Sequence, residues 1–323
     1  MPGVYVDPGP VRAPLCGGGA AGPVRQVIAP QERRRTITTL MTAFAPRPGR
    51  YLAALLAAIY LLQPASVRAQ TVYPAVAAPE AIVVDGWTGN VLFTKNADLP
   101  RYPASTVKIM TALLVLDRHI PMSRVVTVSA FAASYRGSTA GLYAGERISV
   151  WNLLHGMLLP SGNDAAVALS ESVAGSEARF VALMNRKAWR LHLRHTRFLS
   201  PNGFDIWGQV TTARDLATLA RVAMHRPLFA EVARTKVWTA WSADNRIEHQ
   251  WTNLNKLLWW SGHVDGVKTG TTPGAGACLV SSARERGKWV IEVNMGSTVA
   301  ARFEDGSKLL NYGLAVDAGP PST

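Results

Sequence analysis

Apolar residues follow two different spacings along this chain, and the order of those spacings limits the folds open to it. Alternation predicts two short strands around a turn at residues 85–90, and three more strands within residues 266–296. Between these segments the apolar residues recur at helical intervals. The order of the elements, with strands first, helices in the middle and strands last, predicts one layered α/β (α+β) domain. Its sheet gathers both ends of the chain.

The predicted helices end at residues that commonly stop helices. Pro160 stops one helix and Gly175 closes the next. The predicted helical ranges are 105–118, 149–160, 164–175, 176–193, 212–225 and 301–316.

The first 69 residues have the layout of a targeting region. Arg47 and Arg50 precede an apolar stretch at residues 51–62, and a cleavage site with small residues follows at Val67 and Ala69. The stretch is shorter than the ~20 residues that span a bilayer, which makes an uncleaved anchor the weaker alternative. We therefore expect a secretory signal peptide that is cleaved between Ala69 and Gln70.

The start of this signal is open to two interpretations. Translation from Met1 gives an unusually long signal, whereas Met41 gives one of ordinary length. Residues 1–40 are rich in Pro, Gly and Arg, a composition typical of a disordered leader. We expect residues 1–69 to be leader and signal, and residues 70–323 to form a single exported, periplasmic domain.

Charge and cysteine content exclude some classes of function. The net charge is +13, of which the eight arginines and two acids of residues 1–69 supply +6. The lysines and arginines that give the remaining +7 are interspersed with acidic residues, and no nucleic-acid-binding motif accompanies them. No nucleic-acid partner is therefore expected. Cleavage removes Cys16 and leaves Cys278, which excludes an intramolecular disulfide and a cysteine-based metal site. We expect Cys278 to be a buried strand residue.

Ser105 and Lys108 stand three residues apart at the mouth of an apolar run. In a helix that starts near Ser105 this spacing puts both side chains on one face. Lys108 would be partly desolvated, and a neutral amine within reach of a hydroxyl can accept its proton. A capping serine with an outward-reaching lysine is the alternative, and it is the commoner meaning of the pair taken alone.

Two further short motifs are uninformative singly. Ser161 and Asn163 lie in the break between two predicted helices, where both side chains can point into one cleft or simply form a turn. Ser200-Pro201-Asn202-Gly203 has the same serine–asparagine spacing, and we interpret it as a turn only. Lys268 and Thr269 on a strand can bind a carboxylate, and Gly270 lets a substrate backbone lie close.

The three motifs together carry more information than each one alone. They occur in the order S-x-x-K, S-x-N, K-T-G, which is the set found in penicillin-binding proteins and related β-lactamases. The segments "SGNDAAVALSE", "RDLATLARV" and "VDGVKTGTTPGAGACLVSSAR" closely resemble the low-molecular-weight D-alanyl-D-alanine carboxypeptidases, serine peptidase family S11. The resemblance covers roughly residues 75–316.

The resemblance implies a β-lactamase/transpeptidase-like fold, in which helices pack on an antiparallel sheet. It implies that Ser105 is the acylated nucleophile and Lys108 its general base. Ser161 would relay a proton and Asn163 would contact a substrate amide. The implied substrates are peptidoglycan stem peptides, which lose their terminal D-alanine, and β-lactam antibiotics are implied as covalent inhibitors.

The same resemblance implies how the strand motif is used. Lys268 and Thr269 would face the terminal carboxylate of the peptide, beside Gly270. The backbone N–H groups of Ser105 and Thr271 would form the oxyanion hole. No metal and no organic cofactor is implied.

Two departures from the family pattern alter these expectations. Many members continue into a small β-rich domain and an amphipathic membrane anchor, whereas this chain stops at Thr323, so we expect no C-terminal anchor. Some relatives carry an arginine before K-T-G, where this chain has Leu254 with Lys256 close by. We therefore expect carboxylate affinity to depend more on Lys268.

Three other functions remain as alternatives. A DD-endopeptidase that cuts peptidoglycan cross-links shares the motifs, as does a class A β-lactamase, which needs an additional deacylating glutamate. Glu171, Glu177, Glu231 and Glu248 lie in the right interval but lack the expected surroundings. A non-catalytic peptidoglycan-binding module is the third, and the intact Ser105–Lys108 pair argues against it.

Overall fold

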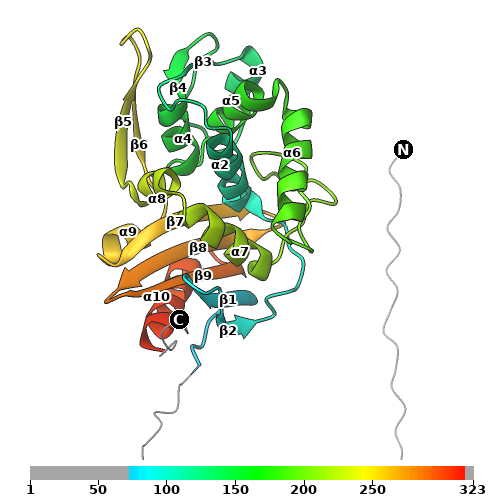
Figure 1. Cartoon of the computed structure of the whole chain (residues 1–323), viewed down its shortest axis with the longest axis vertical. Coiled ribbons are helices and arrows are strands. Elements are labelled where there is room, and N and C mark those ends of the chain that lie inside the picture. Colours follow the sequence, from blue (N-terminus) through cyan, green and yellow to red (C-terminus); the bar gives the residue numbers. More distant parts are fainter. Residues whose placement is uncertain (1–72, 317–323) are drawn as a thin grey trace, which may run out of the picture. The chain divides into compact units, whose positions relative to one another are not determined.

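A computed structural model of the chain describes residues 73–316, and the predicted signal region with its cleavage site lies outside them. The centre is an antiparallel five-stranded sheet in the order β2-β1-β9-β8-β7, as Figure 1 shows. Its strands are β1 (Glu80–Asp85), β2 (Val91–Lys95), β7 (Val264–Thr272), β8 (Gly276–Glu285) and β9 (Lys288–Ser297). The prediction that one sheet gathers both ends of the domain is confirmed. β7 is an edge strand of this sheet.

Two short antiparallel ribbons stand apart from the sheet, and the sequence spacing did not predict them. They pair β3 (Val125–Thr127) with β4 (Arg147–Ser149), and β5 (Val237–Trp241) with β6 (Glu248–Thr252). Each strand in them has three to five residues, too few for alternation to stand out in the sequence.

The six predicted helices are present, and short elements join them. The helices are η1 (Ala104–Val107, a 3-10 turn), α2 (Lys108–Asp117), α3 (Ala130–Ala133), α4 (Val150–Leu158), α5 (Asn163–Ala174), α6 (Glu177–Arg190), α7 (Ala213–Met224), α8 (Pro227–Arg234), α9 (Leu257–Trp260) and α10 (Ala301–Ala315). The helix expected from residue 105 is divided, because a 3-10 turn precedes the α-helix that starts at Lys108.

The alternation of apolar residues in the strands creates two apolar layers. Ile82 and Ile291 belong to a large core on one face of the sheet, where α2, α4, α5 and α7 pack. Val83 and Val290 point to the other face, which α10 covers. Neighbouring strand residues thus reach opposite layers, as the two-residue period requires. The site described below lies where the larger layer meets the edge strand β7.

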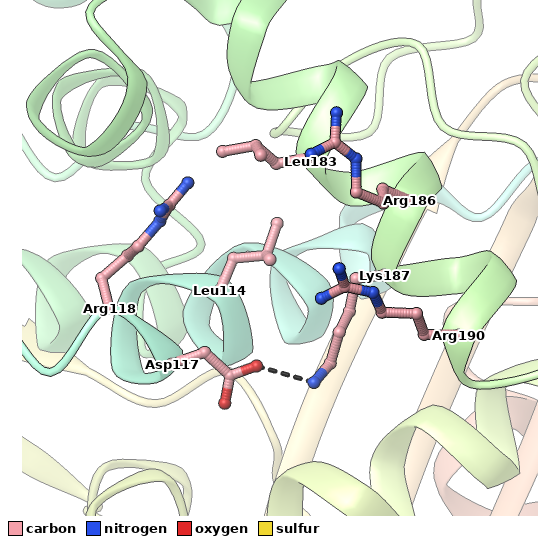
Figure 2. Close-up of a pocket in the computed structure, with 7 residues that line it drawn as sticks. All are labelled: Leu114, Asp117, Arg118, Leu183, Arg186, Lys187 and Arg190. Atoms are coloured by element: carbon pink, nitrogen blue, oxygen red, sulfur yellow. Dashed lines mark hydrogen bonds and ion pairs between the residues drawn. The ribbon is translucent and has the colours of Figure 1, made fainter.

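Helix α2 runs through the helical layer, and eight of its ten residues are buried. Its far end is fixed by Asp117, whose carboxylate accepts hydrogen bonds from Lys187 of α6 at 2.7 Å and from Arg226 at 3.0 Å. Figure 2 shows the first of these contacts in a hollow between α2 and α6 that Leu114 and Arg118 also line. These ion pairs hold the helix that carries Lys108 at its other end, about 14 Å away at 1.5 Å per residue.

Within residues 73–316, none of the helices combines the length and the apolar character needed to cross a membrane.

Candidate active site

Ser105 and Lys108 meet at the start of α2. Lys108 Nζ lies 3.0 Å from Ser105 Oγ, within hydrogen-bond distance. The Lys108 side chain is completely buried, whereas Ser105 is half-buried and therefore open to a substrate. The one-face arrangement predicted from their spacing is present, even though Ser105 sits in the 3-10 turn and Lys108 in the α-helix.

Lys108 is placed so that it loses its charge easily. Burial lowers its pKa well below the ordinary value for lysine, because a buried ammonium has lost its water. The positive charge of Lys268 lowers the pKa further, and the carboxylate of Asp164 opposes the shift. A neutral amine at 3.0 Å from the hydroxyl can accept the proton of Ser105.

Two more polar groups fix the position of Lys108. Its Nζ donates to Asn163 Oδ1 at 2.7 Å and to the backbone carbonyl of Asn202 at 2.8 Å. Asn163 in turn donates through Nδ2 to the carbonyl of Arg136 at 2.8 Å. Together these bonds set the direction of the Asn163 amide and hold the lysine against Ser105.

Ser161 lies in the break before α5, as predicted, with a backbone φ of +67°. Its Oγ is buried and makes no hydrogen bond to another described residue. A buried hydroxyl normally finds a partner, so the Ser161 hydroxyl is free to form a hydrogen bond with another group.

Asp164, the residue after Asn163, holds the loop that borders the site. Its carboxylate accepts hydrogen bonds from Thr139 Oγ1 at 2.6 Å and from the backbone N–H groups of Ala140 and Leu142 at 2.8 and 3.0 Å. The carboxylate is buried, so these charge-assisted bonds are strong. Sequence reasoning missed this role because Asp164 fits equally well as an ordinary first-turn acid of α5.

The K-T-G segment lies on β7 against the η1 turn that contains Ser105. A side-chain carbon on Gly270 would lie 2.9 Å from Ala104 Cβ and 3.0 Å from the backbone nitrogen of Ser105. Only a glycine allows the strand to approach η1 this closely. This reason for a glycine at position 270 differs from the expected one, which was the close approach of a substrate backbone. Lys268 and Thr269 are buried beside it, and Thr271 is exposed at the strand edge.

Lys268 is the second buried lysine of the site. Its Nζ donates to the carbonyl of Thr269 at 3.0 Å. Burial, together with the nearby charge of Arg302, lowers the pKa of Lys268 to about 7. Its charge therefore changes near neutral pH.

Arg302 is a site residue that the sequence did not reveal. It comes from α10, and its Nη1 donates to the Gly270 carbonyl at 3.1 Å and to Thr271 Oγ1 at 2.7 Å. In the segment before K-T-G, where some relatives carry an arginine, Leu254 is exposed and offers no guanidinium. A second cation thus stands beside Lys268, and the expectation that carboxylate affinity depends more on Lys268 stays a prediction.

The interpretation of residues 200–203 as a turn and nothing more was wrong. The carbonyl of Asn202 accepts the Lys108 bond, and the carbonyl of Pro201 accepts from Thr111 Oγ1 at 2.7 Å. Gly203 has a φ of +97°, and a side-chain carbon there would lie 1.9 Å from the Ala104 carbonyl oxygen. The segment therefore forms one wall of the lysine site through its backbone, which a motif search cannot detect.

Cys278 lies in β8 and is buried, as predicted. The contacts above, or direct sequence adjacency, join most of the predicted site residues. These are Ser105, Lys108, Asn163, Lys268, Thr269, Gly270 and Thr271. Ser161 adjoins them two residues before Asn163.

Comparisons with known proteins agree with this geometry. The profile of peptidase family S11, described as D-alanyl-D-alanine carboxypeptidase, matches residues 66–299. D-alanyl-D-alanine carboxypeptidase DacC of Escherichia coli is 40% identical over 281 residues, which is 82% of this chain and 68% of the relative. D-alanyl-D-alanine carboxypeptidase of Streptomyces sp. strain K15 is 37% identical over 259 residues, which is 75% of this chain and 89% of the relative.

Solved structures give the same result. The crystal structure of the Streptomyces K15 DD-transpeptidase is similar with a TM-score of 0.72 and 36% identity, covering 75% of this chain and 99% of that one. The D-alanyl-D-alanine carboxypeptidase DacD of Francisella tularensis has a TM-score of 0.69 and 31% identity, covering 75% and 71%. The β-lactamase/transpeptidase-like fold class expected from the motifs is confirmed. The chain belongs to the D-alanyl-D-alanine carboxypeptidase family, peptidase family S11.

Proposed function

We propose that this chain is a serine-type D-alanyl-D-alanine carboxypeptidase that removes the terminal D-alanine from peptidoglycan stem pentapeptides. The observation that carries the proposal is the buried Lys108, whose pKa is lowered and whose Nζ lies 3.0 Å from Ser105 Oγ. A lysine at this position is expensive to bury and contributes nothing to packing that a methionine would not. Its use as a base explains why it is there.

The reaction follows from the positions of the groups. Ser105 Oγ attacks the carbonyl of the penultimate D-alanine while Lys108 Nζ takes the hydroxyl proton. The C–N bond breaks, and the leaving amine receives that proton by way of Ser161 Oγ. Water then attacks the Ser105 ester while Lys108 takes a proton from the water, and Lys108 passes this proton to Ser105 Oγ as the C–O bond of the ester breaks and the tetrapeptide leaves. The backbone N–H groups of Ser105 and Thr271 stabilise the oxyanion.

The substrate carboxylate is held at the other end of the cleft. Two cationic groups, those of Lys268 and Arg302, lie at the K-T-G segment together with the hydroxyl of Thr269. Charge-assisted hydrogen bonds to a carboxylate are about twice as strong as neutral ones. This end of the cleft therefore favours peptides with a free C-terminus.

The test is incubation of the purified protein with a stem pentapeptide and with a cross-linked muropeptide. We expect release of free D-alanine from the pentapeptide, and penicillin labelling on Ser105 by mass spectrometry. Ser105→Ala should abolish both. Cleavage of the cross-linked muropeptide in preference to the pentapeptide would establish the endopeptidase instead. An adduct on another serine would overturn the assignment of the nucleophile.

Two other functions fit the site less well. A class A β-lactamase needs a glutamate near the acyl-enzyme, but Glu171 accepts a hydrogen bond from Ser129 and Glu177 one from Tyr135. Among the described hydrogen bonds, none joins either carboxylate to Ser105 or Lys108. A non-catalytic binding module has no need of a desolvated lysine beside a half-exposed hydroxyl.

Export is the cellular setting that the activity requires, because peptidoglycan lies outside the cytoplasm. We infer that the chain is cleaved near Ala69 and that residues 70–323 act as a single catalytic domain in the periplasm. N-terminal sequencing of protein from the periplasmic fraction should begin near Gln70. Uncleaved chain in a membrane pellet that only detergent releases would show that residues 51–62 remain as an anchor.

A further inference from the structure

The direction in which a substrate lies along β7 follows from the proposed function, on which this inference rests. The terminal carboxylate is at Thr269, and the scissile carbonyl is between Ser105 and Thr271. β7 is an edge strand, which a peptide can extend by main-chain pairing. At ~3.3 Å per residue, the stem residue that precedes D-alanyl-D-alanine lies beyond Thr271, beside residues 272–274.

A fixed turn, residues 203–209, stands at this position. Asp205 accepts a hydrogen bond from Thr272 Oγ1 at 2.6 Å and another from the backbone N–H of Gly274 at 2.7 Å. Inside the turn, Gln209 donates through Nε2 to the carbonyl of Phe204 at 2.6 Å. The turn is therefore tied both to the end of β7 and to itself.

Trp207 projects from this fixed turn with 91% of its surface exposed. Together with Tyr102 and Gly274 it lines a hollow at the end of β7. The Tyr102 ring and the Asp205 carboxylate both reach Gly274, where a side-chain carbon would lie 2.9 Å from each. The hollow thus begins where the K-T-G strand ends and has two aromatic rings in its lining.

A carboxylate stands at the edge of the hollow, where Asp205 accepts a hydrogen bond from the lining residue Gly274, and the guanidinium of Arg197 approaches the lining residue Gly208. Arg101 also lines it, but its guanidinium is bound to both oxygens of Glu80 at 2.6 and 2.7 Å, which neutralises its charge. Asp205 is exposed and takes part in none of the ion pairs of residues 73–316. Each of its oxygens keeps a free lone pair, because each accepts one of the two bonds given above.

We propose that Asp205 and Trp207 form a subsite for a cationic amine on the side chain of the stem residue that precedes D-alanyl-D-alanine. The indole of Trp207 offers the preferred aromatic face for an ammonium group, and Asp205 supplies the opposite charge. An amine that is acylated, as in a cross-link, carries no charge and loses both interactions. The subsite therefore selects stems whose side-chain amine is free.

The experiment compares two peptides that differ only in this charge. They are Nα-acetyl-L-lysyl-D-alanyl-D-alanine and its Nα,Nε-diacetyl counterpart. We expect kcat/KM to be higher for the free amine, and Trp207→Ala to reduce the ratio of the two values by about two- to five-fold, the range for an exposed cation–π contact. The ratio for the unmodified protein should also fall as salt is added.

Trp189→Ala is the matched control. Trp189 is another tryptophan with a largely exposed ring, at 78%, but it lies on α6 and takes part in none of the site contacts described above. It should leave the ratio unchanged. Penicillin labelling of each variant reports that Ser105 is still correctly placed.

The outcomes separate the two proposals. Hydrolysis of both peptides with equal kcat/KM, or an equal effect of the two tryptophan variants on the ratio, would overturn the subsite and leave the carboxypeptidase in place. Hydrolysis of neither peptide, with no penicillin labelling, would overturn the carboxypeptidase and the subsite with it. A ratio above one that only Trp207→Ala lowers supports both.

Discussion

At the scale of single residues, the site depends on two lysines that burial has made weaker bases. Lys108 lies against Ser105, and Lys268 lies on β7 beside Arg302. Both have lowered pKa values, with desolvation as the largest cause. One is proposed to accept protons and the other to hold a carboxylate, so their titration should affect different kinetic constants.

Lys108→Ala should abolish acylation, because it removes the proposed base, whose Nζ lies 3.0 Å from Ser105 Oγ. Lys108→Arg should not restore it, because a guanidinium does not release its proton at working pH. Covalent labelling by a fluorescent penicillin measures both variants, with thermal unfolding as the check on folding. If Lys108→Arg retained more than trace labelling, the residue would act as a fixed charge and not as a base.

Lys268 should make KM depend on pH. Its pKa of about 7 means that it is protonated below neutral pH and loses its charge above it. Attraction for the substrate carboxylate should therefore weaken, and KM should rise, as pH increases through about 7. Steady-state kinetics between pH 6 and 9 will show this. Lys268→Arg stays charged over this range, so its KM should change less with pH.

At the scale of elements, the division between η1 and α2 decides where Ser105 points. Ala104 has a φ of +48°, and the turn around it is pressed between Gly203 and Gly270. A residue other than glycine rarely adopts a positive φ, so its neighbours must hold it there. The two glycines provide the space in which this strained turn fits.

Gly270→Ala should disrupt catalysis more than folding. The added methyl group would lie 2.9 Å from Ala104 Cβ and 3.0 Å from the Ser105 nitrogen, so β7 and η1 must separate. Overpacking of this kind destabilises by about 1–3 kcal/mol. A displacement of ~1 Å at a reacting group lowers the rate by about 100-fold. We expect kcat/KM for the pentapeptide to fall by that order.

Gly262→Ala is the control for this variant, because no atom lies within 4 Å of its added carbon. It should leave both kcat/KM and the unfolding temperature near those of the unmodified protein. Normal penicillin acylation by Gly270→Ala would contradict the proposed packing of strand against turn.

At the scale of the whole molecule, the site collects residues from segments that are far apart in the sequence. Lys108 binds Asn163 and Asn202, which are 55 and 94 residues away, and Arg302 reaches Gly270 across 32 residues. The sheet and its two layers carry these segments to one edge (Figure 1). The layer on the other side of the sheet contains a further buried charge-bearing group, Glu292.

Glu292→Gln should stabilise the fold, and more so at higher pH. Glu292 is fully buried on β9, its Oε1 has no hydrogen-bond partner among the described residues, and burial raises its pKa well above the ordinary value of 4.5. A carboxyl with a raised pKa supports folding below about pH 4.5 and loses that contribution as pH rises. Glutamine does not titrate, so its advantage should grow with pH.

Thermal unfolding at pH 5 and pH 8 measures this effect. A gain of about 1 kcal/mol corresponds to a rise of roughly 2–4 °C in Tm for a domain of this size. Glu248→Gln, at an exposed position on β6, should change Tm little at either pH. A larger gain from Glu292→Gln at pH 5 than at pH 8 would contradict the raised pKa.

The sequence by itself determined those features that depend on local spacing. Strand and helix periods predicted the six long helices and a sheet that joins both ends of the domain. The order of three short motifs identified Ser105, Lys108 and Lys268 as candidates, because each motif carries its chemistry within a few residues. Short ribbons such as β5 and β6 escaped prediction, because strands this brief leave no clear period.

Only the tertiary structure decided how these candidates work together. The lowered pKa of Lys108 comes from burial by distant segments, and its partner at Asn202 is a backbone carbonyl that carries no sequence signature. The sequence around Arg302 is that of an ordinary helix, and only the packing of α10 against β8 and β9 places this arginine at Thr271. Desolvation and charge proximity depend on which surfaces meet, and the spacing of residues along one segment does not contain that information.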